Sequence, residues 1–148
     1  MNRPLLIPPH VAGFCITIEI VLIFVFKQCR VIPFPYNLSG ILLILLGQGL
    51  IISANSHMKR CKTTFTYQKS TSLVTSGPFD FSRNPMYLGL IIVLSGLSIL
   101  VSNAIGFLLP LLSFAFFQWY FIPFEEWKSS QEFGDAYEEY RKKVRRWL

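Results

Sequence analysis

The sequence has little charge for its length, and this scarcity excludes several classes of protein. Only 15% of its 148 residues are charged, whereas a soluble domain carries roughly 25%. Hydrophobic residues make up 52%, which excludes a disordered chain, a collagen-like chain and a coiled coil. The composition fits a small integral membrane protein, and the length predicts one domain, 1–148.

Cysteine is scarce too, and several common site motifs are missing. Cys15, Cys29 and Cys61 match no zinc or haem spacing, so we expect free thiols in a reducing compartment. The sequence has no phosphate-binding glycine loop, no metal-ligand pair and no nucleophile elbow, and we expect no metal. Its net charge of +6 is not gathered on the face of a soluble domain, so nucleic acid is not an expected partner.

Four long apolar runs are present instead, and crossing a bilayer takes about 20 residues. The predicted spans are 11–27, 38–56, 86–102 and 104–124. The first run contains Glu19 and no cleavage site follows it, so we expect a retained helix rather than a signal peptide. Only Ser102 and Asn103 separate the apolar runs 88–101 and 104–124, which predicts that the last two spans form a tight antiparallel hairpin. The predicted fold is an all-α, polytopic membrane protein.

The basic residues are distributed unevenly between the two sides of these spans. With four spans, the N-terminal segment, the 57–85 loop and the 125–148 tail share one side. That side holds all but two of the 14 Lys and Arg residues. Because cytoplasmic loops carry an excess of Lys and Arg, we expect both termini and any site in these segments to be cytoplasmic.

The tail is expected to form an amphipathic helix at the membrane surface. We expect Gly134 to end one helix and Asp135 to cap the next, and Pro123 to bend the end of the last span. Apolar side chains recur at helical spacing along the tail: Phe133, Tyr137, Tyr140, Val144 and Trp147.

The segment 76–89 carries the clearest indication of a site. Pro85 suits the first turn of a helix and Asn84 suits its N-cap. Free N–H groups at a helix start attract an anion, and Arg83 adds a clamp for a carboxylate or phosphate, with Tyr87 one turn further on. The alternative is an ordinary helix start beside a cytoplasmic arginine.

Four further acidic or basic residues are candidates. Glu125 and Glu126 follow the last span, where carboxylates are costly unless solvated or partnered. They could accept hydrogen bonds from a ligand or simply face water. His57 ends the second span and could act as a base or only reach the membrane surface. Glu19 is expected to face the bundle or a cavity.

Two motifs together resemble a known family. The first is Gly77-Pro78…Arg83-Asn84-Pro85-Met86-Tyr87-Leu88-Gly89, which resembles the Gly-Pro…Arg-His-Pro-x-Tyr-x-Gly pattern of the isoprenylcysteine carboxyl methyltransferases. These enzymes are similar to the phospholipid N-methyltransferases. The second comprises Glu125-Glu126, Phe133-Gly134, Tyr137, Tyr140 and Val144, which resemble the family's C-terminal pattern. The resemblance covers about 64–148, and Asn84 departs from it by replacing a His.

The resemblance implies S-adenosylmethionine (SAM) as methyl donor and a lipophilic acceptor, such as an isoprenylcysteine carboxylate, that enters from the lipid bilayer. It also implies a cofactor pocket lined by Arg83, Asn84, Pro85, Tyr87, Glu125, Glu126, Tyr137 and Tyr140. The catalytic residue stays open among Glu125, Glu126 and His57. Asn84 can form hydrogen bonds but carries no proton at neutral pH, so we interpret it as a cofactor ligand.

Other functions remain open on the sequence alone. The acceptor could be a phospholipid amine, and then a group such as a glutamate, His57 or water must accept its proton. The chain could also be an NADPH-dependent membrane reductase, because such enzymes resemble the same C-terminal region, or a non-catalytic membrane subunit with the same fold. The sequence does not determine whether oxygen, nitrogen or sulfur is methylated, or the oligomeric state.

Overall fold

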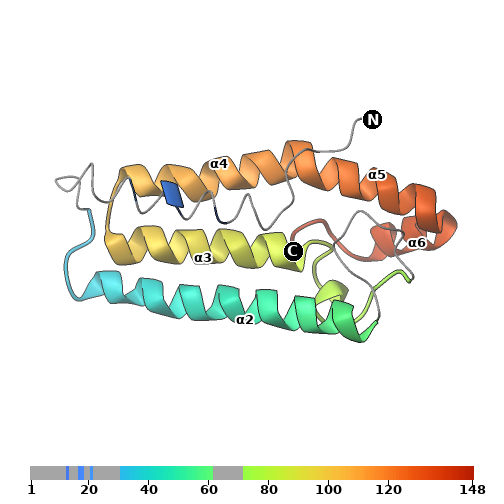
Figure 1. Cartoon of the computed structure of the whole chain (residues 1–148), viewed down its shortest axis with the longest axis horizontal. Helices are drawn as coiled ribbons and strands as arrows, with labels where there is room; N and C mark the ends of the chain where they lie inside the picture. The colour runs from blue at the N-terminus through green and yellow to red at the C-terminus, as the bar shows by residue number, and fades with distance from the viewer. Residues whose placement is uncertain (1–12, 14–16, 19–20, 22–30, 62–71) are drawn as a thin grey trace.

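The computed structural model describes residues 13, 17–18, 21, 31–61 and 72–148, and the regular structure among them is helical (Figure 1). The predicted all-α fold is therefore confirmed for this part of the chain. Most of the first predicted span, 11–27, lies outside the described residues, together with Glu19.

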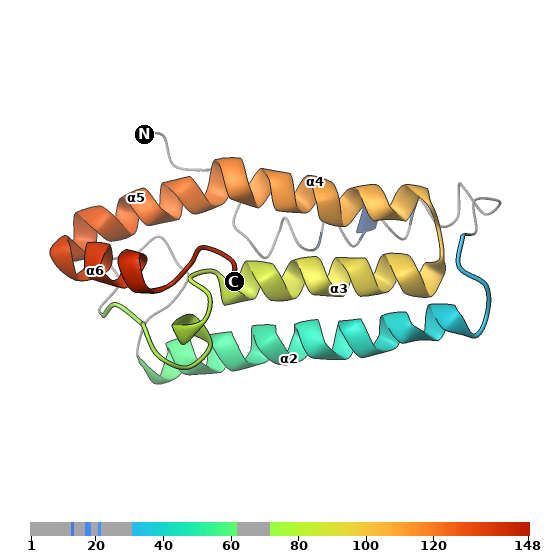
Figure 2. The same cartoon turned by 180° about the vertical axis from the view of Figure 1, so that it is seen from behind.

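The bundle is built from α2 (Ser39–Arg60), α3 (Pro85–Val101) and α4 (Leu108–Phe116), which lie side by side in Figures 1 and 2. A π-helical turn, Phe117–Phe121, joins α4 to α5 (Ile122–Phe133), and α6 (Asp135–Lys143) folds back beside α5. Short 3-10 turns are formed by Tyr36–Leu38, Gly77–Asp80 and Ile105–Phe107. Ser102 ends α3 with φ 60°, and the predicted hairpin of α3 and α4 follows.

The π-helical turn has a local cause in the sequence. Pro123 has no backbone N–H to donate to the carbonyl four residues earlier, and its ring crowds that carbonyl. Trp119, which carries this carbonyl, lies inside the turn. A widened turn relieves the crowding without breaking the helix. The chain also changes direction from α4 to α5 at this turn (Figure 2), close to Pro123, where the bend is expected.

Glycines allow α2 and α3 to pack backbone against backbone. A Cβ atom built on Gly47 of α2 would lie 2.6 Å from the carbonyl oxygen of Gly89 on α3. Gly40 and Gly96 form the same kind of contact nearer the other end of the helices. Small residues in a line are typical of helices that approach closely in lipid.

Among the residues that the structure describes, two helices are long and apolar enough to cross a membrane, Tyr36–Arg60 and Ile105–Phe133, whereas α3 is shorter with 17 residues. These helices are consistent with a membrane protein, and the number of four spans remains a prediction. Large apolar side chains are exposed along α2 and α4: Ile41, Leu42, Leu45, Leu46, Ile52, Leu108, Leu111 and Leu112.

Asn84 is the N-cap residue of α3, as expected, although its side chain makes no capping hydrogen bond. Two other local predictions are wrong. Gly134, with φ 52°, is the N-cap of α6, so Asp135 is the first helical residue and not the cap. The tail helix ends at Lys143, since Val144 is extended with φ −117° and ψ 132°. Val144 and Trp147 therefore do not continue the helical face of Tyr137 and Tyr140.

Two groups of buried side chains form the core. The first lies between α3 and the α4–α5 helix and comprises Tyr87, Leu90, Leu94, Phe117, Phe121 and Ile122. The second lies where α2 ends against the Gly77–Asp80 turn and α6, and comprises Ala54, Met58, Phe79, Tyr137 and Tyr140. The candidate site is next to the second group.

Candidate functional site

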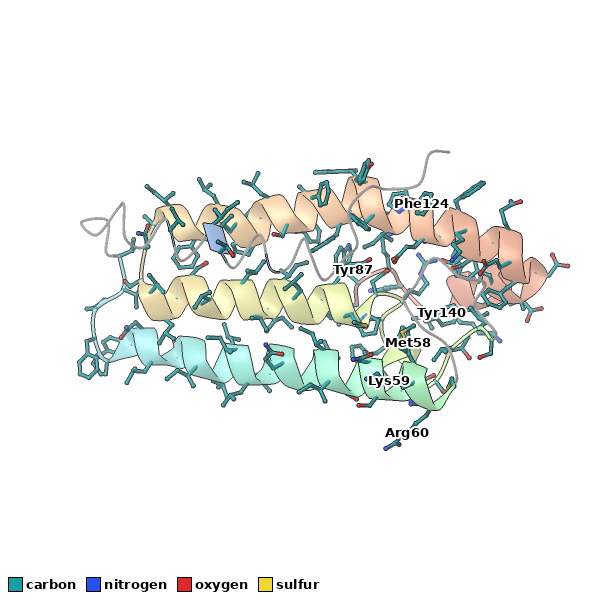
Figure 3. All side chains as sticks on the ribbon, viewed as in Figure 1. Met58, Lys59, Arg60, Tyr87, Phe124 and Tyr140 are labelled. Atoms are coloured by element: carbon teal, nitrogen blue, oxygen red, sulfur yellow. The ribbon has the colours of Figure 1, made fainter. Side chains whose placement is uncertain are left out.

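A cavity of about 140 Å³ lies at the end of the bundle where α2 ends and α3 begins. Figure 3 shows Met58 and Tyr140 at this end of the molecule. Six residues that the sequence singled out line the cavity: Arg83, Asn84, Glu125, Glu126, Tyr137 and Tyr140. The remaining lining residues are mostly apolar: Met58, Ser72, Leu73, Val74, Phe79, Ser129 and Phe133. The structure therefore brings together two motifs that are about 40 residues apart in the chain.

Glu126 is held by two arginines. Its Oε1 atom lies 3.0 Å from Nη2 of Arg83 and 3.1 Å from Nε of Arg146. Its Oε2 atom accepts a hydrogen bond of 2.6 Å from Nη2 of Arg146. Both Glu126 and Arg83 are nearly buried, with side chains 11% and 9% exposed. Glu126 is thus fully paired, and the three side chains together keep one net positive charge.

Arg83 retains hydrogen-bonding capacity inside the cavity wall. Its Nε and Nη1 atoms are buried and have no hydrogen-bond partner among the residues that the structure describes, although the Tyr137 hydroxyl also interacts with this guanidinium. Leaving a buried donor unpaired costs roughly 1–3 kcal/mol, and more for a charged group. Arg83 can therefore donate hydrogen bonds to a bound ligand, and a carboxylate or a phosphate group is the kind of ligand group that arginine binds well.

Glu125 is held in place by Tyr87. The Tyr87 hydroxyl donates a hydrogen bond of 2.8 Å to Oε1 of Glu125. The Tyr87 ring is buried against Phe117, with ring centroids 4.6 Å apart. Tyr87 itself is not among the residues that line the cavity. Its contact to the site is through the Glu125 carboxylate.

Tyr137 and Tyr140 form the α6 side of the cavity and are protonated at neutral pH. Burial raises the pKa of Tyr137 to about 12, and the Glu126 carboxylate adds to this effect while the Arg83 guanidinium opposes it. Burial also raises the pKa of Tyr140, whose hydroxyl donates a hydrogen bond of 2.7 Å to the Phe79 carbonyl. These phenols can contribute rings and hydrogen bonds but are not bases.

The last five residues, 144–148, form a tail that lies against the start of α3 (Figure 2). The backbone N–H of Arg83 donates to the Arg145 carbonyl at 3.0 Å, and Nδ2 of Asn84 donates to the Arg146 carbonyl at 2.9 Å. The Trp147 indole donates to Gln118 at 2.7 Å. The sequence pattern does not predict this docking, because Arg146 belongs to a basic run that fits a cytoplasmic tail equally well.

Two other predicted residues lie away from the cavity lining. Pro85 is fully buried at the start of α3, as expected for a first-turn proline. Nε2 of His57 lies 2.8 Å from Oγ of Ser76, and the His57 ring packs against Gly77. His57 thus fastens the Gly77–Asp80 turn to α2. Across the described ranges, no three acidic, His or Cys residues group into a metal site.

Comparison with known proteins agrees with the two motifs. Residues 35–136 match the sequence model of the family described as "Phospholipid methyltransferase". A protein-S-isoprenylcysteine O-methyltransferase of Schizosaccharomyces pombe is 34% identical over 119 residues, which cover 74% of this chain and 48% of that protein. Protein-S-isoprenylcysteine O-methyltransferase A of Arabidopsis thaliana is 29% identical over 114 residues, covering 71% of this chain and 55% of that protein.

The chain spans about half the length of these curated relatives. The family match covers more than two thirds of the chain and includes Arg83, Asn84, Glu125 and Glu126. The resemblance predicted from the sequence motifs is confirmed. This chain belongs to the phospholipid methyltransferase family.

Proposed function

We propose that the chain is a SAM-dependent methyltransferase that acts on a lipophilic acceptor at the cytoplasmic face of a membrane. The observation that carries the proposal is the pair of buried, unpartnered donors of Arg83 in a cavity that also contains carboxylates and aromatic rings. The named relatives, protein-S-isoprenylcysteine O-methyltransferases, support the reaction class.

The residues of the cavity fit the parts of SAM. Arg83 suits the carboxylate of its amino-acid portion, because its Nε and Nη1 donors are buried without a hydrogen-bond partner among the described residues. Glu125 can accept a hydrogen bond from a ribose hydroxyl or the ammonium group. Tyr137 and Phe133 offer rings to the adenine or, by cation–π attraction, to the sulfonium. When bound, SAM supplies an electrophilic methyl group.

Positioning of the acceptor is one task of this site. No histidine lines the cavity within the described residues, and Asn84 and the two tyrosines do not accept a proton at neutral pH. Glu126 is paired with two arginines, so Glu125 is the carboxylate of the lining that could accept a proton. A carboxylate acceptor is already a nucleophile and needs no base, so its alignment with the methyl group is sufficient. The names of the relatives, O-methyltransferases, favour this acceptor, whereas an amine acceptor would need Glu125 as its base.

The apolar surface indicates how such an acceptor reaches the site. The exposed leucines and isoleucines of α2 and α4 fit contact with acyl chains, and the cavity lies at the polar end of the same helices. Trp119, Tyr120 and Trp127 are exposed toward this end, where aromatic side chains suit the membrane interface. We infer that the acceptor enters from the bilayer between helices and the polar cofactor from the cytoplasm.

The size of the cavity implies movement on binding. Pockets for small organic ligands measure about 300–1,000 Å³, and the cavity here is about 140 Å³. We therefore expect the walls to separate when a ligand of the size of SAM binds. The wall formed by residues 72–74 and the wall formed by α6 are attached to different helices, so they can separate without unpacking α2 from α3.

A methyl-transfer assay tests the proposal. The purified protein in lipid nanodiscs receives SAM with a labelled methyl group and either N-acetyl-S-farnesylcysteine or phosphatidylethanolamine. A methyl ester releases labelled methanol in base, whereas a methylated amine does not. We expect base-labile label on the farnesylcysteine and none with an Arg83→Met protein.

Each other result has a defined meaning. Base-stable label on phosphatidylethanolamine would replace the carboxylate acceptor with an amine. NADPH oxidation without methyl transfer would indicate a reductase. No transfer and no SAM binding by the folded protein would contradict the proposed function and leave a non-catalytic subunit.

A further inference from the structure

Arg146 is the charged residue at the site that neither the motifs nor the family resemblance predicts. It is carried by the tail, 144–148, and reaches Glu126 on α5 across 20 residues of sequence. Its guanidinium bonds both Glu126 oxygens, at 3.1 Å and 2.6 Å, which is the two-pronged geometry of a strong arginine–carboxylate pair. This contact is direct and specific, unlike that of a solvated surface charge.

The Arg146 pair determines how Arg83 is used. Arg83 meets Glu126 through Nη2 alone, at 3.0 Å, because Arg146 already occupies both carboxylate oxygens. Without Arg146, Glu126 could turn to form a two-pronged pair with Arg83. That pair would occupy, besides Nη2, one of the two Arg83 nitrogens that are now buried and unpartnered.

We propose that Arg146 is a positioning residue: it occupies Glu126, so that Arg83 presents free donors to the carboxylate of the cofactor. This inference rests on the proposed function. The tail is anchored for this role, because the backbone carbonyls of Arg145 and Arg146 accept hydrogen bonds from Arg83 and Asn84. The same backbone contacts tie Arg146 to the start of α3, where Arg83 lies.

Calorimetric binding of two ligands separates this role from a general structural one. S-Adenosylhomocysteine carries the amino-acid carboxylate, and 5′-methylthioadenosine has the same adenosine portion without a carboxylate. We expect Arg146→Ala to weaken S-adenosylhomocysteine binding by about tenfold or more, as for the loss of a charge-assisted contact. Binding of methylthioadenosine should change by less than about threefold.

Two variants complete the design. Lys143→Ala removes one exposed positive charge from the end of α6 and should bind both ligands like the wild type. Arg146→Lys keeps the charge but lacks the planar fork, so it should weaken S-adenosylhomocysteine selectively and by less than Arg146→Ala. If Arg146→Ala does not fold, the binding of the same two ligands to Arg146→Lys tests the role of Arg146.

The outcomes distinguish this inference from the proposed function. The role of Arg146 is overturned if its variants bind both ligands more weakly by the same factor. It is also overturned if they bind S-adenosylhomocysteine as tightly as the wild type does. Either result leaves the cofactor assignment intact. A folded wild-type protein that binds neither ligand overturns both.

Discussion

Asn84 and Arg146 are 62 residues apart in the chain, and Nδ2 of Asn84 donates a hydrogen bond of 2.9 Å to the Arg146 carbonyl. Asn84 stands where the family pattern has a histidine. In this chain its side chain neither caps α3 nor points to a role as a base, and it fastens the tail to the helix start. Asparagine in place of the family's histidine thus keeps a side-chain N–H that can donate a hydrogen bond at this position.

Replacing Asn84 tests this link. Asn84→Ala removes the donor and leaves the Arg146 carbonyl with only the weak 3.5 Å contact from Ser82, so stability should fall by about 1–2 kcal/mol. Asn84→His retains an N–H donor and should cost less. The free energy of unfolding in mixed micelles, titrated with dodecyl sulfate, gives both values. Equal stability of Asn84→Ala and the wild type would show that the bond is not needed.

Tyr87→Phe removes one hydroxyl and keeps the ring packed on Phe117. The change removes the Tyr87 partner of the buried Glu125 carboxyl group and should lower stability by about 1–3 kcal/mol, the range for a buried polar group that loses its partner. Tyr87→Leu also loses ring packing and should be less stable still. The same micelle titration measures both. If the Tyr87→Phe protein is as stable as the wild type, the hydrogen bond between Tyr87 and Glu125 does not stabilise the fold.

Gly47→Ala should disrupt the packing of α2 on α3. The added methyl group would lie 2.6 Å from the Gly89 carbonyl oxygen, so the helices must separate, at a cost of about 1–3 kcal/mol. Gly49→Ala is the matched control, because nothing lies within 4 Å of its Cβ position on the same helix. Alanine there should be neutral or stabilising by up to about 1 kcal/mol. Thermal unfolding of the two variants should differ in direction, and identical shifts would refute the close approach.

Alkaline pH should destabilise the fold through Tyr137. The folded state raises the pKa of this phenol from about 10 to about 12, so between these values the folded state binds more protons than the unfolded state. Stability is therefore fully retained below pH 10 and falls as the pH rises toward 12. Tyr137→Phe should show a shallower fall over this range when unfolding is followed at a series of pH values. An unchanged slope would mean that Tyr137 does not contribute.

The helices and the charged residues of the cavity lining could be predicted because both depend on local patterns. The apolar runs marked α2, α3 and α4, and the turn residues of 76–89 together with Glu125 and Glu126 marked the site. Tyr87 was assigned to the pocket because it lies one turn into α3, but side-chain packing directs it to Glu125. Helical periodicity gives the spacing along α3 and does not give the rotation of that helix relative to α5.

The tail could not be predicted for a different reason. Val144 and Trp147 continue the helical spacing of Tyr137 and Tyr140, yet the chain leaves the helix at Val144. The extended backbone gains hydrogen bonds to Arg83 and Asn84 and the pair between Arg146 and Glu126. The hydrogen bonds join residues 62 positions apart, and the ion pair joins the tail to α5 across 20 positions, so no local pattern encodes them.

Calorimetric titration of SAM into the detergent-purified protein tests the central claim most directly, with an Arg83→Met variant and NADPH as controls. The variant leaves Glu126 paired with Arg146, so the fold should survive the change. We predict micromolar binding of SAM by the wild type, its loss in the variant, and no binding of NADPH. A folded wild-type protein that does not bind SAM, or an Arg83→Met protein that binds it equally well, would contradict the account.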